Sequence, residues 1–175
     1  MYGPQTRPPP GPTHFTTAAR ASLHSQLFAC NGGGGSNIGE IGYRGEVVQF
    51  SPYINTPAGQ LLRMPVETAC LSSGFGWRSS MGGNGRQHNG LDLANREGGY
   101  IYAAGDGRVV RADYRGGYGN TLELDHGHGV HTLYAHLFEI DPNLQPGSFV
   151  TAGTPVARMG NTGNATGVHL HYEVW

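Results

Sequence analysis

Residues 120–137 read NTLELDHGHGVHTLYAHL. Apolar and polar residues alternate on both sides of the glycine-containing stretch HGHG at 126–129. Alternation with a period of two is typical of a half-buried strand, and two such runs joined by a short link with glycine predict a β-hairpin. We therefore expect two antiparallel strands here, joined by the HGHG turn.

Short runs of the same kind occur on both sides of this hairpin and are separated by turn residues. Between residues 62 and 175 they are NGLDLA at 89–94, YIYAAGDGRVVRADY at 100–114, GSFVTAGTPVARMG at 147–160 and HLHYEVW at 169–175. The chain also holds 30 glycines in 175 residues, and glycine is costly inside helices. The sequence therefore predicts an all-β protein, with a small antiparallel β-sheet or sandwich domain.

The N-terminal segment, residues 1 to about 45, differs in composition from the rest. It is rich in Pro, Gly, Ser and Asn, with RPPPGP at 7–12 and CNGGGGSN at 30–37. Such segments bury little apolar surface and tend to be extended or disordered. We expect a flexible, poorly structured segment at 1–45, with one short helix over ASLHSQLFA at 21–29, followed by one domain at 46–175.

Composition and charge exclude several classes of protein. Only 13% of the residues are charged and the net charge is -1, which argues against a nucleic-acid binder because such proteins usually carry a basic patch. No run of about 18 apolar residues exists, so no membrane span is expected. The N-terminus lacks the apolar stretch of a secretory signal. LFAC at 27–30 resembles a lipoprotein cleavage box, but the residues before it are too polar.

Two cysteines, Cys30 and Cys70, leave the cellular compartment open. They would pair in an exported protein and stay reduced in the cytosol. One disulfide and two free thiols are equally compatible with the sequence.

The end of the chain carries two histidines one residue apart, in GVHLHYEVW at 167–175. In a strand, residues two apart point to the same face. His169 and His171 are therefore expected to project together, with Leu170 and Tyr172 on the other face. Two imidazoles on one face could both bind a metal, or one could bind it while the other takes part in chemistry.

Other candidate residues precede this pair. His88 and Asp92 lie in HNGLD, where four residues of straight strand would span about 13 Å, so the chain must bend at Asn-Gly for both to reach one metal. A turn followed by a solvated Asp is the alternative interpretation. His136 lies at the end of the run 131–137, where a lone histidine is more often structural.

Taken together, these residues indicate a metal site. One Asp and two His form a hydrolytic zinc site with three protein ligands and a fourth position for water. Two further histidines could orient that water, take its proton and stabilise an oxyanion. No catalytic role is expected for the remaining five histidines: His14, His24, His126, His128 and His131.

Five stretches of the sequence resemble one known family. They are SSGFGWR at 72–78, HNGLDLA at 88–94, AAGDGRVV at 103–110, GGYGNTLELDHGHGVHTLYAHL at 116–137 and GTPVARMGNTGNATGVHLHYEVW at 153–175. In order and spacing, these stretches are similar to those of the lysostaphin/LytM-type zinc metalloendopeptidases, which cleave peptide cross-links of bacterial peptidoglycan. The resemblance covers residues 62–175 and implies a β-sheet domain whose loops wall a narrow groove.

The resemblance also implies a role for each candidate residue. His88, Asp92 and His171 would bind zinc, while His136 and His169 would be catalytic. The two neighbouring histidines would then have divided roles. Peptidoglycan peptides would be the substrate, and the protein would act in the cell envelope, outside the cell or in a phage particle. The oligomeric state and the bond cleaved, glycyl-glycine or D-alanyl–diaminopimelate, stay open.

The sequence departs from the family at both ends. The chain ends at Trp175, whereas family members usually continue, so the sequence is expected to be cut short and the last strand less well supported. Asn31 or Asn37 of the N-terminal segment could occupy the fourth zinc position, although a flexible tail is the expected outcome.

Two alternative functions stay open. One is a catalytically silent binding or activator module, against which the presence of all five site residues argues. The other is a zinc protease that acts on another glycine-rich peptide.

Overall fold

The computed structural model describes residues 11–21, 26–30, 42–47, 51–73, 76–78, 86–88 and 90–175. For 73, 76–78 and 86–88 only the backbone is described. The described chain is almost entirely β, which confirms the predicted fold class.

The predicted hairpin at 120–137 is present. It consists of β10 (Asn120–Asp125) and β11 (His131–Ile140), which pair antiparallel. The other strands also fall on the predicted runs: β7 (Gly90–Ala94), β8 (Tyr100–Tyr102), β9 (Gly107–Tyr114), β12 (Phe149–Val150), β13 (Pro155–Met159) and β14 (His169–Val174). Earlier in the chain are α1 (His14–Thr17), β1 (Phe28–Ala29), β2 (Tyr53–Thr56), β3 (Gly59–Leu62), β4 (Cys70–Ser73), β5 (Gly76–Arg78) and β6 (Arg86–His88).

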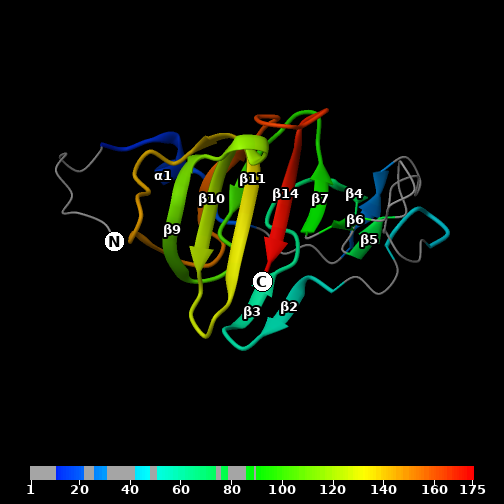
Figure 1. Cartoon of the computed structure of the whole chain (residues 1–175), viewed down its shortest axis with the longest axis horizontal. Coiled ribbons are helices and arrows are strands. Elements are labelled where there is room, and N and C mark those ends of the chain that lie inside the picture. The colour runs from blue at the N-terminus through cyan, green and yellow to red at the C-terminus, as the bar shows by residue number, and fades with distance from the viewer. Residues whose placement is uncertain are drawn as a thin grey trace.

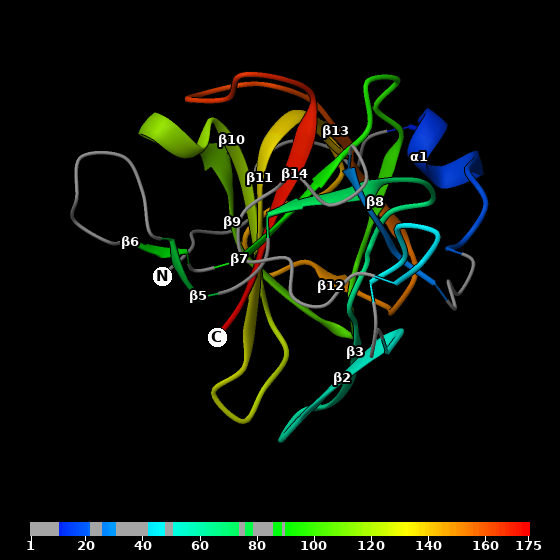
Figure 2. The ribbon, with the colours of Figure 1, turned by 90° about the vertical axis from the view of Figure 1, so that its right-hand side faces the viewer.

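Ten strands form one large sheet in the order β1-β4-β7-β14-β11-β10-β9-β12, with β13 paired to both β11 and β8. The β1–β4 pair is parallel and the other pairs of this sheet are antiparallel. Two hairpins, β2–β3 and β5–β6, lie outside it (Figures 1 and 2). The C-terminal strand β14 therefore lies in the middle of the sheet, between β7 and β11.

This central position corrects one expectation. The last strand was expected to be less well supported, but β14 pairs on both sides, with β11 and with β7. The backbone of Trp175 extends the pairing, because it exchanges two hydrogen bonds with His131 at 2.6 and 2.9 Å. Strand order, which local sequence does not reveal, supplies the support.

The apolar side chains of the strands form one buried cluster. In β14, Leu170 and Tyr172 are fully buried within it, whereas His169 and His171 keep partial exposure. The Tyr172 hydroxyl donates to the carbonyl of Leu62 at 2.7 Å, which satisfies its buried polar atom. The predicted alternation is confirmed, and it aims both histidines away from the core.

The described parts of the N-terminal segment contact the domain. Phe15 of α1 is 3% exposed and packs edge-on against the ring of Tyr100 at 5.6 Å. The helix expected over 21–29 is wrong at its end, where Phe28–Ala29 is strand β1 beside β4. Leu27 and Ala29 are buried and Phe28 is exposed, so pairing with β4 overrides local helix preference. Residues 31–40, which hold both candidate asparagines, lie outside the described residues.

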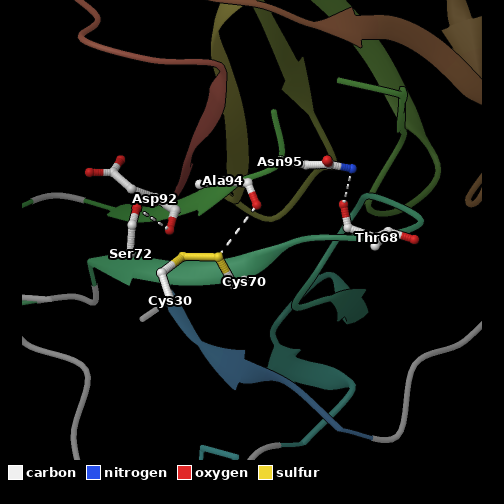
Figure 3. Close-up of a disulfide and its surroundings, with 7 residues drawn as sticks. All are labelled: Cys30, Thr68, Cys70, Ser72, Asp92, Ala94 and Asn95. Atoms are coloured by element: carbon white, nitrogen blue, oxygen red, sulfur yellow. Dashed lines mark hydrogen bonds between the residues drawn. A yellow bond between two sulfur atoms is a disulfide. The ribbon is translucent and has the colours of Figure 1, made fainter. Parts of the chain in front are cut away.

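A disulfide between Cys30, the residue after β1, and Cys70 of β4 reinforces the pairing of these two strands (Figure 3). Cys30 and Cys70 are bonded with their Cα atoms 5.0 Å apart, which answers a question the sequence left open. Cys70 lies opposite Ala94 of β7. The crosslink therefore ties the N-terminal segment to the strand next to Asp92. Within the part of the chain that the structure describes, no helix is long and apolar enough to cross a membrane.

Candidate active site

Four of the five predicted site residues lie on three adjacent strands. Asp92 is on β7, His169 and His171 are on β14, and His136 is on β11. Across the sheet, His171 lies opposite Asp92 on one side and opposite Ala135 on the other. The central position of β14 thus brings together side chains that are as many as 79 residues apart in sequence.

The two histidines of β14 both lie close to the carboxylate of Asp92. Nδ1 of His171 lies 2.9 Å from Oδ1 of Asp92. Nε2 of His169 lies 4.0 Å from the same oxygen. Both contacts come from the face of β14 that alternation predicts, since residues two apart share a face.

His171 makes a second short contact on the other side of its ring. Nε2 of His171 lies 2.8 Å from Oε2 of Glu173, which is only 4% exposed. The Glu173 carboxylate also accepts hydrogen bonds from the Tyr118 hydroxyl and from Nε1–H of Trp175, each at 3.1 Å. Glu173 and Tyr118 are not among the predicted site residues. The spacing of two between His171 and Glu173 is the signal that puts Glu173 on the same face.

His136 lies at a bulge in β11. Its φ of +61° is in the left-handed region, and the pairing with β10 shifts beside it, between Asn120 and Leu122. A bulge re-aims a side chain, and strained backbone of this kind concentrates at functional sites. Nδ1 of His136 lies 2.7 Å from the carbonyl oxygen of Thr162. Since a carbonyl only accepts, Nδ1 carries the hydrogen and Nε2 keeps its lone pair.

His169 is held in the same manner. Its Nδ1 lies 2.9 Å from the carbonyl oxygen of Gly167, so its Nε2 is also the nitrogen left for the site. The rings of His136 and His169 are 4.7 Å apart between centroids. Two histidines from different strands therefore have neighbouring rings, and the loop 160–168 orients both through their Nδ1 atoms.

Glycines allow this loop to approach its neighbour closely. Gly163 has a φ of +73°, and a Cβ there would lie 2.4 Å from the backbone nitrogen of Gly119. A Cβ on Gly119 would lie 2.4 Å from Oγ1 of Thr162. The Thr162 hydroxyl in turn donates to the carbonyl of Leu137 at 2.8 Å. This packing fixes the Thr162 carbonyl against His136.

The pKa values of two site histidines shift in opposite directions. Burial lowers the pKa of His136, and the nearby rings of His169 and His171 lower it further, whereas the hydrogen bond that His136 donates to the Thr162 carbonyl raises it. For His171, burial alone would lower the pKa, but hydrogen bonds to Asp92 and Glu173 raise it to about 9. In the metal-free chain, His136 is neutral at pH 7 and His171 is protonated.

The fifth predicted residue, His88, ends β6, and its side chain lies outside the described residues. Strand β6 pairs with β5, whereas β7 belongs to the large sheet, so the pairing changes between His88 and Gly90. Among described side chains, no group of three or more His, Cys, Asp and Glu residues forms a metal site. The Asp92 oxygen and the His171 nitrogen are ligand types that zinc takes, and this donor pair fits the ion.

Three of the remaining histidines make contacts outside the candidate site. His14 pairs with Glu139 at 2.7 Å, and His131 pairs with Glu123 at 2.9 Å. His126 is half-buried at the start of the β10–β11 turn. Its Nδ1 lies 2.7 Å from the carbonyl of Asp106 and its Nε2 lies 2.7 Å from Oγ1 of Thr132, so it bridges two parts of the sheet. His24 lies outside the described residues.

Comparison with known proteins agrees with this geometry. The sequence pattern of Peptidase family M23 matches residues 86–175, about half of the chain. The chain belongs to peptidase family M23. The matched M23 region runs from β6 to β14 and contains all five predicted site residues. The resemblance to the lysostaphin/LytM family is thereby confirmed.

Individual relatives agree with the M23 assignment. The chain is 37% identical over 116 residues to peptidoglycan DD-endopeptidase ShyB of Vibrio cholerae, a match covering 64% of this chain and 27% of ShyB. A zinc-containing peptidase from Vibrio cholerae has a TM-score of 0.61 at 30% identity, over 70% of this chain and 42% of that one. The catalytic domain of lysostaphin from Staphylococcus simulans has a TM-score of 0.54 at 30% identity, over 61% and 79%. The chain spans about a quarter of the length of the curated relatives it matches.

Proposed function

We propose that this M23 domain is a zinc-dependent endopeptidase that hydrolyses peptide cross-links of bacterial peptidoglycan. The observation that carries the proposal is the convergence of Asp92, His136, His169 and His171 from three adjacent strands. Family membership supports the peptidase activity, and the name of ShyB, a peptidoglycan DD-endopeptidase, supports the substrate.

In this proposal His88, Asp92 and His171 hold the zinc ion. When bound, zinc supplies Lewis-acid chemistry, because it polarises a peptide carbonyl and lowers the pKa of water. His171 offers Nδ1 to the ion, since that nitrogen faces Asp92 while Nε2 faces Glu173. His171 therefore gives up its Nδ1 proton when the metal enters.

His136 and His169 handle protons in this proposal. Each ring donates Nδ1–H to a backbone carbonyl, so each offers Nε2 to the reactants. His136 is neutral at pH 7 because burial lowers its pKa, and it accepts a proton from the attacking water. The same proton then passes to the amine that leaves when the C–N bond breaks. His169 orients the water from the neighbouring position.

The proposed location is the cell envelope or the outside of the cell. Cross-linked peptidoglycan is found there, and the Cys30–Cys70 disulfide is typical of an oxidising compartment. The same disulfide argues against a reduced cytosolic chain.

The proposal is tested on intact cell-wall sacculi. The zinc-loaded chain is incubated with sacculi of diaminopimelate type and with sacculi of glycine-bridged type, and released peptides are identified by mass spectrometry. His136→Ala serves as the control, after its zinc content and thermal unfolding are shown to match those of the wild type. New peptides from one type of sacculus, absent with the control, identify an endopeptidase and its bond.

Two results would contradict the proposal. Equal release by wild type and His136→Ala would remove the catalytic assignment. No release from either type, with stoichiometric zinc bound, would favour a binding module instead.

A further inference from the structure

Glu173, the carboxylate behind His171, neither binds the metal nor transfers a proton in the proposed mechanism. A histidine that binds a metal through one nitrogen usually donates the N–H of the other to a carboxylate or carbonyl, which fixes the ring's tautomer and direction. In this chain the two nitrogens of His171 face two different carboxylates, Asp92 at 2.9 Å and Glu173 at 2.8 Å. The question is which carboxylate lies on the metal side.

The position of His169 answers this question. Nε2 of His169 lies 4.0 Å from Oδ1 of Asp92, and the ring of His136 lies 4.7 Å from that of His169. Asp92 therefore faces the other candidate site residues. Glu173 lies on the opposite side of the His171 ring, where its partners are Tyr118 and Trp175.

Glu173 is itself held firmly. It is 4% exposed, and both of its carboxylate oxygens accept hydrogen bonds: Oε2 from His171 and Tyr118, and Oε1 from Trp175. Gly90 lies opposite Glu173 in the β7–β14 pair, and a Cβ there would lie 2.9 Å from Cγ of Glu173. Three hydrogen bonds and the space left by the missing side chain of Gly90 therefore hold the Glu173 carboxylate in one position.

We propose that Glu173 is a positioning residue for the zinc ligand His171. By accepting Nε2–H, it fixes the tautomer in which Nδ1 carries the lone pair and points toward Asp92. This inference rests on the proposed metal-binding role of His171. Tyr118 and Trp175 act indirectly, because their hydrogen bonds hold the Glu173 carboxylate.

The chain offers a matched control for this role. Glu123 is also buried, at 8% exposure, and its Oε2 lies 2.9 Å from Nδ1 of His131. The Glu123–His131 pair thus resembles the Glu173–His171 pair and contributes no residue to the proposed site. The His131 ring stacks on Trp175 at 5.0 Å, so this control also covers any change that passes through Trp175. Replacing Glu123 removes a buried carboxylate from a histidine without touching His171.

The experiment compares zinc affinity by chelator competition in wild type, Glu173→Gln, Glu173→Ala and Glu123→Gln. Loss of an outer partner of a metal ligand typically weakens binding about 10–100-fold. We expect the loss of zinc affinity in Glu173→Ala to be near the upper end of that range. The loss in Glu173→Gln should be near the lower end, because glutamine keeps an acceptor oxygen. Glu123→Gln is expected to bind zinc like the wild type. Equal affinity in the Glu173 and Glu123 variants would overturn the positioning role.

A second measurement uses the wild type alone, so that a folding defect in a variant does not decide the result. In the zinc-loaded chain, nitrogen-15 NMR of the His171 ring should show a proton on Nε2 and none on Nδ1. A proton on Nδ1 would overturn the proposal.

His171→Ala separates this proposal from the proposed function. If that variant binds zinc as tightly as the wild type, His171 is no ligand and both proposals fail. If it loses zinc while the Glu173 variants keep wild-type affinity, only the positioning role fails.

Discussion

The candidate site has two halves that hold histidines in different ways. The strand-held half consists of Asp92, His171 and Glu173, which lie on the paired strands β7 and β14. The loop-held half consists of His136 and His169, whose Nδ1 atoms bond to carbonyl oxygens of the loop 160–168. Each half uses a different hydrogen-bond partner to choose which ring nitrogen faces the site.

The difference teaches how one side-chain type can take two roles. Two carboxylates raise the pKa of His171 to about 9, so this ring favours a positive charge beside it, whether proton or metal. Burial lowers the pKa of His136, whose partner is an uncharged carbonyl, so this ring stays neutral and can accept a proton. The partner of the ring, rather than the histidine itself, sets the chemistry.

The largest expected effect comes from removing one histidine from each half. In His171→Ala, zinc affinity should fall by more than about 100-fold, because a direct ligand is removed. Loss of an outer partner of a ligand typically weakens affinity only about 10–100-fold. His136→Ala should keep zinc near wild-type affinity while turnover of sacculi falls about 10²–10⁴-fold. Chelator competition and peptide release measure the two quantities. Equal loss of zinc in both variants would contradict the division into halves.

A smaller effect is expected when the loop is displaced without changing any histidine. Gly163→Ala places a Cβ 2.4 Å from the backbone nitrogen of Gly119, so the loop 160–168 and Gly119 must separate. We expect this shift to disturb the neighbouring Thr162 carbonyl, which accepts the hydrogen bond from His136. Turnover should fall up to about 100-fold, as expected for a misplaced catalytic group, while zinc affinity stays unchanged. Steady-state rates and chelator competition test this together.

Gly127→Ala is the matched control for the loop variant. Gly127 also has a positive φ, +86°, but no atom lies within 4 Å of its Cβ position. It should share the backbone strain and keep normal turnover. If both glycine variants lose turnover equally, strain rather than loop position is responsible.

Titration of the metal-free chain should separate the halves by pH. The pKa of His136 in the folded chain should lie below the value of about 6.5 that histidine has when unfolded. The pKa of His171 should lie near 9. His171 then stabilises the metal-free fold below about pH 6.5, and this contribution is lost as pH rises through about 9. His136 has the opposite sign, since its contribution is present above about pH 6.5 and is lost as pH falls. Histidine NMR shifts between pH 5 and pH 10 provide the measurement, and the same pKa for both rings would remove the contrast.

The smallest effect on the site is expected from the disulfide. The double variant Cys30→Ser, Cys70→Ser removes the covalent link between the N-terminal segment and β4 but leaves the β1–β4 pairing, and removal of a native crosslink typically lowers the free energy of unfolding by about 2–4 kcal/mol. Zinc affinity should stay unchanged in the folded variant, because the pairing of β7 with β14 still holds Asp92. Urea unfolding and chelator competition give both values. A large loss of zinc would show that the strand-held half depends on the crosslink.

Much of the fold follows from local pattern. The period of two in 120–137 and 169–175 predicts the β10–β11 hairpin and the two faces of β14. The helix expected over 21–29 is wrong at Phe28–Ala29, because pairing with β4 decides that segment. Glu173 and Thr162 are absent from the predicted site. The spacing of two places Glu173 on the same face as His171 but does not show that it contacts the ring, and nothing local pairs Thr162 with His136.

The sequence by itself determined that His169 and His171 share a face opposite Leu170 and Tyr172, because alternation depends only on neighbouring residues. Family resemblance added the expected roles of the five site residues. Only the tertiary structure decided that β14 lies between β7 and β11, that His136 meets a carbonyl 26 residues away, and that Cys30 meets Cys70. These features arise from contacts between distant parts of the chain, and such contacts exist only once the sheet has assembled.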